Sequence, residues 1–271
     1  MVTALITGGT SGIGAAFARS LASRGYDLVL VARDQGGLDR TATELATRAG
    51  TAVETISADL SNREDVARVA ARLGDADRPI DLLVNNAGFG VHSCLVTTDP
   101  APHDRALEVM VRAVLVLGGA AAVAMSKRGH GSILNVSSTA GFITMGSYSA
   151  IKAWVTSYTE GLSVELRGTG VTATALCPGW VRTEFHERAG IRTGSIPKSL
   201  WVDVTTTVET GLRDAEKGRV ISIPTFRFRA LIWLARHAPK SAIRSVSAAI
   251  KSGRSDSAPV EESSGEKSAT S

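Results

Sequence analysis

The sequence predicts an α/β fold in which a doubly wound parallel sheet of seven strands carries helices on both faces, within a single domain. Three observations predict it. Short apolar, β-branched runs alternate with longer amphipathic segments, a glycine-rich turn follows the first run, and 271 residues with 44% hydrophobic content can enclose one large core. Such alternation is typical of parallel strands joined by right-handed crossovers.

The strands and helices follow from these patterns in chain order. Runs rich in Val, Ile and Leu predict strands at residues 2–7, 28–31, 53–56, 82–84, 132–136, 171–176 and 220–223. Amphipathic segments predict helices at residues 12–24, 36–49, 63–73, 103–127 and 147–167. Because parallel strands bring their carboxyl ends to one edge of the sheet, we expect the ligand site at that edge.

The glycine-rich turn at residues 7–14 reads TGGTSGIG and lies between the first strand and the first helix. In Rossmann-like folds, glycines here permit a tight turn, let the backbone approach a pyrophosphate and pack the helix on the strand. The helix N-terminus then faces the phosphates. The alternative is a glycine-rich turn without a ligand. The residues expected to bind a dinucleotide are Gly8, Thr10, Ser11, Gly12, Ile13 and Gly14.

The end of the second strand bears on the choice of cofactor. An acid at this position accepts hydrogen bonds from a ribose 2′-hydroxyl, whereas an arginine pairs with a 2′-phosphate. The chain has Ala32 followed by Arg33, which favours NADP(H) over NAD(H). Two alternatives stay open: Arg33 stacks on adenine or is solvated, or Asp34 reaches the ribose of NAD.

Tyr148 and Lys152 are four residues apart in a predicted helix, so both side chains lie on one face. A phenol that exchanges a proton near neutrality needs its pKa lowered from about 10 by roughly three units. A fixed cation beside it favours the phenolate, so we expect Lys152 to lower the pKa of Tyr148. The alternative is a half-buried helix on which the two residues are merely neighbours.

Charge and cysteine content exclude several other classes. The net charge is +4; the last twenty residues carry −2 of it, which leaves +6 for residues 1–251. Without a basic stripe or a zinc spacing, we expect no nucleic-acid partner. The two cysteines and five histidines form no ligand-like spacing, so no metal is expected, and a reducing cytoplasm is the expected location.

Residues 252–271 are rich in Ser, Glu and Gly and are expected to be disordered.

Six motifs occur together and in a fixed order, and with them the chain resembles the short-chain dehydrogenase/reductase family, in its compact single-domain branch. They cover residues 2 to 183, and residues 184–223 are compatible. The motifs are Thr7-Gly8-x-x-x-Gly12-Ile13-Gly14, Asp59-Leu60, Asn85-Asn86-Ala87-Gly88, Asn135-Val136-Ser137-Ser138, Tyr148-x-x-x-Lys152 and Pro178-Gly179-x-Val181-x-Thr183.

The resemblance implies a catalytic group and a nicotinamide site. Ser138 would bind the substrate carbonyl, Tyr148 would give it a proton, and Lys152 would hold the nicotinamide ribose. Ser137 would face the other side of its strand. The further cofactor-binding residues that the resemblance implies are Asp59 and Leu60 at the adenine, Asn86, Ala87 and Gly88 at the ribose, and Pro178, Gly179, Val181 and Thr183 at the nicotinamide.

One of these residues has a structural alternative, and the chain departs from the family pattern in two places. Asp59 could instead cap the following helix. The family's Asn that kinks the long helix and anchors a relay water is replaced by Met110, whose side chain cannot hold that water. The segment between Ser138 and Tyr148 is also shorter than usual, which should open the substrate side. Residues 184–202 correspond to the family's substrate lid.

The predicted C-terminal helices, at residues 226–251, lie in a segment that has seven bases and no acid through residue 254. A basic amphipathic helix can lie on an anionic membrane. The alternative, which we favour, is that these helices close the substrate cleft and present a solvated basic face.

The function predicted from all of this is an NADP(H)-dependent oxidoreductase. It would interconvert a ketone or aldehyde and an alcohol by hydride transfer, with a small-molecule substrate and a homodimeric or homotetrameric assembly. A cofactor-binding but redox-silent sensor or scaffold and a membrane-surface reductase of lipid or steroid ketones are the alternatives. The sequence does not identify the substrate, because this fold serves many chemistries.

Overall fold

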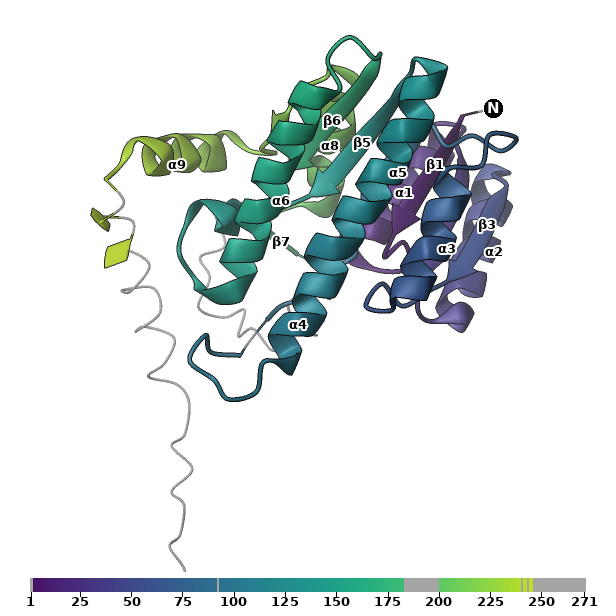
Figure 1. Ribbon diagram of the computed structural model, residues 1–271. Helices are drawn as coiled ribbons and strands as arrows, with labels where there is room; N and C mark the ends of the chain where they lie inside the picture. The colour runs from purple at the N-terminus through teal and green to yellow at the C-terminus, as the bar shows by residue number, and fades with distance from the viewer. Residues whose placement is uncertain (1, 92, 183–199, 240, 243, 246–271) are drawn as a thin grey trace, which may run out of the picture.

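The computed structural model describes residues 2–91, 93–182, 200–239, 241–242 and 244–245. Most of the predicted lid at residues 184–202, most of residues 240–251 and the predicted tail at residues 252–271 lie outside the described residues. The described part is one α/β domain with a central parallel sheet (Figure 1).

The sheet has seven parallel strands in the order β3-β2-β1-β4-β5-β6-β9, which confirms the predicted doubly wound fold. The order reverses between β1 and β4, where the chain crosses from one half of the sheet to the other. The strands are β1 (Thr3–Thr7), β2 (Asp27–Ala32), β3 (Val53–Ser57), β4 (Leu82–Asn85), β5 (Gly131–Val136), β6 (Val171–Leu176) and β9 (Ile221–Ser222).

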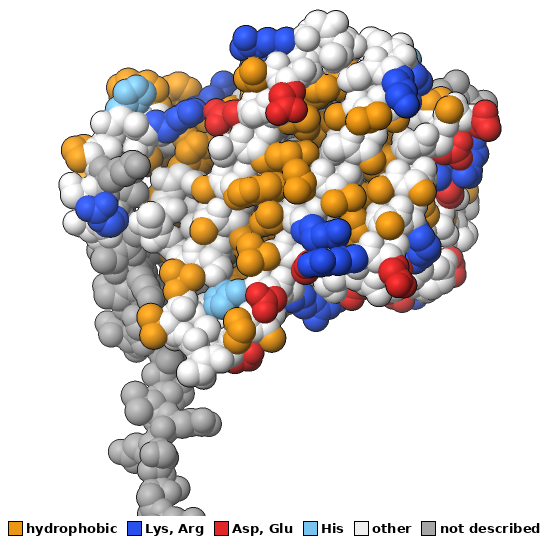
Figure 2. Space-filling model, viewed as in Figure 1, with side chains coloured by type: hydrophobic (Ala, Val, Ile, Leu, Met, Phe, Trp, Pro, Cys, Tyr) orange, Lys and Arg blue, Asp and Glu red, His pale blue; other side chains and the backbone are white. Residues whose placement is uncertain are grey.

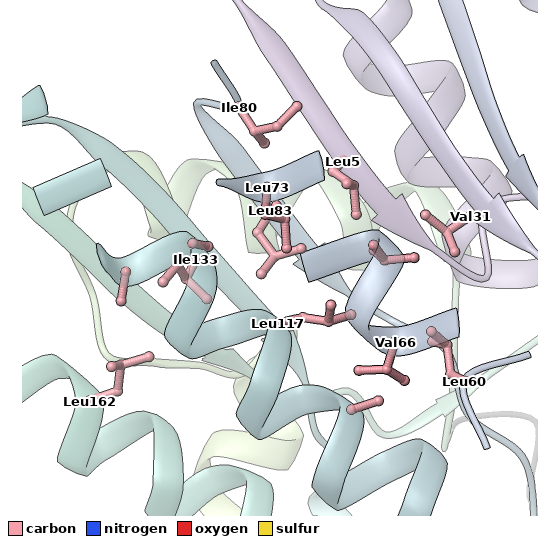
Figure 3. Packing of buried hydrophobic residues seen from close by; sticks show 14 of the residues in the cluster. Leu5, Val31, Leu60, Val66, Leu73, Ile80, Leu83, Leu117, Ile133 and Leu162 are labelled. Atoms are coloured by element: carbon pink, nitrogen blue, oxygen red, sulfur yellow. The ribbon is translucent and has the colours of Figure 1, made fainter. Parts of the chain in front are cut away.

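Alternating side chains along the strands divide the core into two layers. Leu5 faces the layer under α3, α5 and α6, whereas its neighbours Ala4 and Ile6 face the layer under α1, α2 and α8. Figure 3 shows the first layer, in which Leu83 and Ile133 meet residues of the covering helices. The helices are α1 (Gly12–Ser23), α2 (Gln35–Ala49), α3 (Arg63–Leu73), α5 (Ala113–Arg128), α6 (Gly146–Glu165), α8 (Val204–Glu216) and α9 (Phe226–His237).

The long predicted helix at residues 103–127 is continuous but not uniform. It consists of α4 (Ala101–Leu107), a π-helical turn η1 (Glu108–Arg112) and α5. By length and composition alone, Ala101–Arg128 is sufficient for a membrane span, yet half of its most apolar window is buried in the core. That burial is ordinary for the central helix of an α/β layer.

Two features were not predicted. A second sheet of two short parallel strands, β7 (Trp180–Val181) and β8 (Trp201–Val202), follows β6. Helix α8 was also missed, because its first half, VTTTVET, is rich in β-branched residues that favour strands. Asp203 starts this helix by accepting a hydrogen bond from the Thr206 backbone N–H at 2.8 Å.

Candidate active site

The sheet brings most of the predicted site residues to one edge. Gly8 follows β1, Arg33 follows β2, Asp59 follows β3, Asn86 follows β4 and Ser138 follows β5. The pairings along β3-β2-β1-β4-β5-β6 are all parallel, so these carboxyl ends are neighbours. Residues that are far apart in the sequence therefore line one edge, where ligands bind in open α/β sheets.

The glycine loop has the backbone shape that a phosphate cradle requires. Gly8 and Gly12 have φ angles of 67° and 55°, a region that side chains disfavour. A methyl group at Gly14 would overlap the carbonyl oxygen of Gly8 and lie 2.5 Å from Nδ2 of Asn86. Helix α1 starts at this loop without an acidic residue in its first turn. Its positive end therefore suits the pyrophosphate of a dinucleotide.

Hydrogen bonds fix this loop to the end of β4. Asn86 Nδ2 donates to the backbone oxygen of Thr7 at 2.9 Å and to that of Gly8 at 3.3 Å. Thr7 Oγ1 in turn accepts from the backbone N–H groups of Asn86 and Ala87, each at 3.0 Å. The side chain of Asn86 therefore holds the glycine loop to the sheet. The backbone of Ala87 and Gly88 follows directly after it, next to the loop.

At the other end of the predicted cofactor site, the carboxylate of Asp34 already accepts two hydrogen bonds from the backbone. Its carboxylate accepts from the backbone N–H groups of Gly36 and Gly37, each at 3.1 Å, and so caps helix α2. Arg33, by contrast, is exposed beside Asp59. Asp34 is thus held as a helix cap while Arg33 stays exposed, and this arrangement favours the reading in which Arg33 selects the cofactor.

Asp59 does not cap the helix that follows it. Asn62 is the N-cap of α3, and its side chain accepts from the backbone N–H groups of Glu64 and Asp65. Asp59 Oδ1 instead accepts from the backbone and side chain of Ser61 at 2.9 and 2.8 Å. Although burial acts to raise it, the pKa of Asp59 is lowered, because the Ser61 hydrogen bonds and nearby arginines favour the carboxylate. Leu60 is buried in the core.

Ser138, Tyr148 and Lys152 are brought together where β5 ends and α6 begins. The Ser138 side chain is hydrogen-bonded to Tyr148, and its Oγ also accepts from the Ala140 backbone N–H at 3.1 Å. Lys152 Nζ donates to the backbone oxygen of Val136 at 2.8 Å and lies 5.6 Å from the centre of the Tyr148 ring. Ser137 faces α6, where its Oγ is 2.7 Å from the Lys152 carbonyl oxygen.

The predicted direction of the Tyr148 pKa is wrong for this structure. Burial raises the pKa of Tyr148 to about 12, and the Ser138 hydrogen bond only partly opposes it. Lys152 is bonded to Val136 and does not lower the tyrosine pKa here. Burial also lowers the pKa of Lys152 itself, to about 8. Tyr148 is therefore a protonated phenol at neutral pH, which is the form that can donate a proton.

The buried Lys152 should make folding stability depend on pH. Its folded pKa of about 8 lies below its ordinary value of 10.5, so the unfolded chain binds more protons between these pH values. The free energy of unfolding should therefore rise with pH through this window, by about 3 kcal/mol, relative to a Lys152→Met variant. Urea denaturation of both proteins from pH 7 to 10 measures it. A difference that does not change with pH would contradict the prediction.

Met110 is buried inside the π-helical turn, at the position where the resemblance places an Asn. The Ala113 backbone N–H bonds to the Glu108 oxygen, five residues back, so the helix is interrupted here without an Asn. A Cβ atom on Gly88 would be 3.1 Å from Met110 Sδ, so the thioether lies against Gly88, one of the residues predicted at the ribose. The side chain of Met110 fills apolar space and supplies no strong hydrogen-bonding group.

The turn after β6 packs against the C-terminal helix. The Pro178 carbonyl oxygen accepts from the Thr139 backbone N–H at 2.9 Å, which ties this turn to the end of β5. A Cβ atom on Gly179 would overlap the ring of Phe228 in α9, so only glycine permits this contact. Val181 is buried in β7. Thr183, the last predicted nicotinamide contact, lies outside the described residues.

One pair beside the site was missed by sequence reasoning. His103 Nε2 lies 3.0 Å from the carbonyl oxygen of Cys94, and its Nδ1 lies 2.7 Å from Oγ of Ser147. Since a carbonyl can only accept, Nε2 carries a proton, and in the neutral ring Nδ1 accepts from the Ser147 hydroxyl. This pair fastens the start of α6, next to Tyr148, to the segment after β4. The two partners are 44 positions apart in the sequence, so no local pattern indicated this contact.

Comparisons with known proteins agree with this geometry. The family model for short chain dehydrogenases matches residues 2–192. A galactitol 2-dehydrogenase (L-tagatose-forming) of Cereibacter sphaeroides is 35% identical over 208 residues, covering 74% of this chain and 79% of that protein.

Two solved structures are similar over nearly their whole length. A short-chain dehydrogenase from Sphingobium yanoikuyae in complex with NADPH is 32% identical, with a TM-score of 0.79 and coverage of 98% of this chain and 99% of that one. A short-chain dehydrogenase/reductase from Burkholderia phymatum in complex with NAD is 28% identical, with a TM-score of 0.75 and coverage of 86% and 92%.

Proposed function

The chain belongs to the short-chain dehydrogenase family, whose members bind a nicotinamide cofactor, and we propose that it is an NADP(H)-dependent oxidoreductase. It would interconvert a ketone or aldehyde and the corresponding alcohol. The observation that carries this proposal is the convergence of Ser138, Tyr148 and Lys152 beside the glycine loop edge of the sheet. Galactitol 2-dehydrogenase, a relative, is named for reaction at an alcohol, which supports the same reaction class.

The side chains divide the work by their chemistry. When bound, the nicotinamide cofactor supplies or accepts the hydride. The Ser138 hydroxyl would orient the substrate oxygen, and Tyr148 would donate the proton that this oxygen needs on reduction. A phenol is protonated at neutral pH already at its ordinary pKa, and burial, which raises the pKa of Tyr148 to about 12, strengthens that state. Lys152, held by Val136, places a cation next to the phenol ring and would bind the ribose hydroxyls of the cofactor.

Purified protein tests this proposal directly. Titration with NADPH should quench protein fluorescence, and NADPH absorbance should decrease in the presence of members of a ketone and aldehyde panel. An enzyme of this class should also reduce NADP⁺ with the matching alcohols. Failure to bind NADPH, or binding without turnover on any member of a broad panel, would contradict the proposal.

The preference for NADP(H) rests on the contrast between Arg33 and Asp34. Arg33 is exposed at the end of β2, where its guanidinium can pair with a 2′-phosphate, whereas Asp34 caps α2. Arg33→Ser should weaken NADPH binding by roughly tenfold to a hundredfold and leave NADH binding within a few fold. Calorimetric titration with both cofactors measures the change.

A matched control separates a specific contact from general charge. Arg48 is an exposed arginine at the far end of α2, the helix that follows Arg33, and it pairs with Glu44 at 3.0 Å. Arg48→Ser should leave both affinities unchanged. If Arg33→Ser weakens NADPH and NADH equally, Arg33 does not select the 2′-phosphate.

One observation favours a second candidate, a redox-silent protein that binds the cofactor as a sensor or scaffold. Met110 fills the position of the usual relay Asn and brings no polar group to the buried lysine. A chain of this kind would bind NADPH with ordinary affinity and oxidise none of it. Tyr148-dependent turnover would exclude this candidate.

We also propose that the chain forms a homodimer or homotetramer through α5 and α6. Figure 2 shows hydrophobic side chains gathered on the face that these helices form in Figure 1. Leu115, Val123 and Val164 are among the exposed hydrophobics. A contiguous exposed apolar patch is typical of an interface. Light scattering during gel filtration would give the mass, and a monomer would contradict the proposal.

A further inference from the structure

Helix α9 presents an apolar face away from the rest of the protein. Its inner side is fixed, because Phe228 and Ile232 are buried and the Phe228 ring contacts Gly179. In Figure 1 the helix lies at the edge of the molecule and extends away from the sheet. Large apolar side chains on its other sides are exposed: Phe226 by 79%, Leu231 by 52%, Trp233 by 63% and Leu234 by 60%.

Three of these exposed side chains, together with Ala230, form a stripe along the helix. Phe226, Ala230 and Leu234 are four residues apart, and Trp233 is three residues after Ala230, so all four share one face of the helix. An exposed aromatic residue stands near each end of this stripe. A hollow of about 290 Å³, lined by Trp201, Val202 and Phe226 among others, continues the apolar surface at its first turn.

Arginines border the stripe on both sides. Arg227 lies on one side of it and Arg229 and Arg236 on the other, and all three are exposed. Two of them also contact the rest of the protein: Arg229 Nε donates to the Ile223 carbonyl oxygen at 3.1 Å, and Arg236 pairs with Glu160 at 3.5 Å. Figure 2 shows hydrophobic and basic side chains together over α9. The sequence adds more bases and no acid through residue 254. The surface is therefore mostly apolar in the centre, where the ring of His237 lies against that of Trp233, and cationic at its margins.

We propose that α9 binds the surface of an anionic lipid bilayer. The stripe would enter the boundary between headgroups and acyl chains, while the arginines extend their guanidinium groups to lipid phosphates. Trp and Phe are well suited to this depth, since aromatic residues are enriched at membrane interfaces. A second copy of the chain fits the same face less well, because a two-fold contact would oppose arginine to arginine.

Flotation of the full-length protein with vesicles tests the proposal. The protein should float with vesicles of phosphatidylcholine containing about one third phosphatidylglycerol, and binding to pure phosphatidylcholine should be on the order of tenfold weaker. Raising the salt concentration from 20 mM to 500 mM should release it from the anionic vesicles, because salt screens the arginine contacts. Absence of flotation with anionic vesicles at low salt, or equal binding to both vesicle types, would overturn the proposal.

A paired substitution locates the contact. Trp233→Glu with Leu234→Glu places two carboxylates in the stripe and should lower partitioning on the order of tenfold or more. The control is Leu95→Glu with Val96→Glu, an apolar pair in the segment after β4 that is exposed by 69% and 96%, which should lower it far less. Equal loss in both variants would attribute the effect to net charge and overturn the role of α9.

A measurement on the unmodified protein does not depend on either variant folding. Brominated acyl chains quench tryptophan fluorescence on contact, so anionic vesicles that contain them should quench the emission of the protein. In Trp233→Phe, which keeps an aromatic ring in the stripe, most of that quenching should disappear. Quenching that persists unchanged in Trp233→Phe would place the membrane contact elsewhere. Binding of poly-glutamate at low salt without any vesicle binding would identify an acidic polypeptide as the partner instead.

Discussion

Tyr148→Phe should abolish most of the carbonyl reduction while leaving cofactor binding intact. The substitution removes only the hydroxyl, which is the proton donor in the proposed reaction, so the rate should fall on the order of 10³-fold. The NADPH affinity should stay within a few fold, because the ring that packs beside Lys152 is retained. Steady-state kinetics on the best carbonyl of the panel and a fluorescence titration with NADPH measure the two quantities.

Tyr158→Phe is the matched control for this substitution. Tyr158 lies in the same helix, its ring stacks on Trp154 at 5.0 Å, and its hydroxyl is 3.5 Å from the Leu115 carbonyl oxygen, away from Ser138. This variant should keep near-normal turnover. If Tyr148→Phe retains more than about one tenth of the wild-type rate, another group donates the proton and the assignment of Tyr148 as general acid is wrong.

Gly14→Ala should disrupt the cofactor loop more strongly than its size suggests. The added methyl group would overlap the Gly8 carbonyl oxygen and crowd Nδ2 of Asn86, so the loop or the start of α1 must move. Overpacking of this kind costs about 1–3 kcal/mol of folding free energy. A shifted loop also moves the backbone N–H groups that would face the pyrophosphate, so NADPH affinity should fall on the order of a hundredfold.

Gly161→Ala provides the contrast. Gly161 lies within α6, is exposed, and has no atom within 4 Å of an added Cβ. Alanine is the better helix former, so this variant should gain about 0.5–1 kcal/mol of stability and keep its NADPH affinity. Thermal unfolding and calorimetric titration compare the two variants. Normal cofactor affinity in Gly14→Ala would show that the loop does not hold the pyrophosphate.

The strands were the most predictable part of the fold. Buried parallel strands are continuous runs of Val, Ile and Leu, and the predicted runs at residues 28–31 and 82–84 match β2 (Asp27–Ala32) and β4 (Leu82–Asn85) closely. Helix α8 was missed because its β-branched first half carries the wrong local preference. Packing of Val208 and Leu212 on the sheet outweighs that preference, and no local pattern reveals it.

The candidate site was predictable where its spacing is local. Tyr148 and Lys152 are one helical turn apart, and the glycine loop directly follows β1, so both could be read from the chain. The pKa values of these side chains could not be predicted from the sequence. Burial sets the pKa of Tyr148 at about 12 and that of Lys152 at about 8, and burial depends on segments distant in sequence. The predicted lowering of the tyrosine pKa was wrong for that reason.

The sequence by itself therefore determined the fold class, the family and the position of the reactive groups at the sheet edge, because periodicity and motif spacing are properties of neighbouring residues. Tertiary structure decided what each group contacts. It directs Lys152 to Val136, engages Asp34 as a helix cap and turns the apolar stripe of α9 outward. These outcomes depend on which distant surfaces meet, and the free energies of burial and hydrogen bonding that select among them are set only in the folded chain.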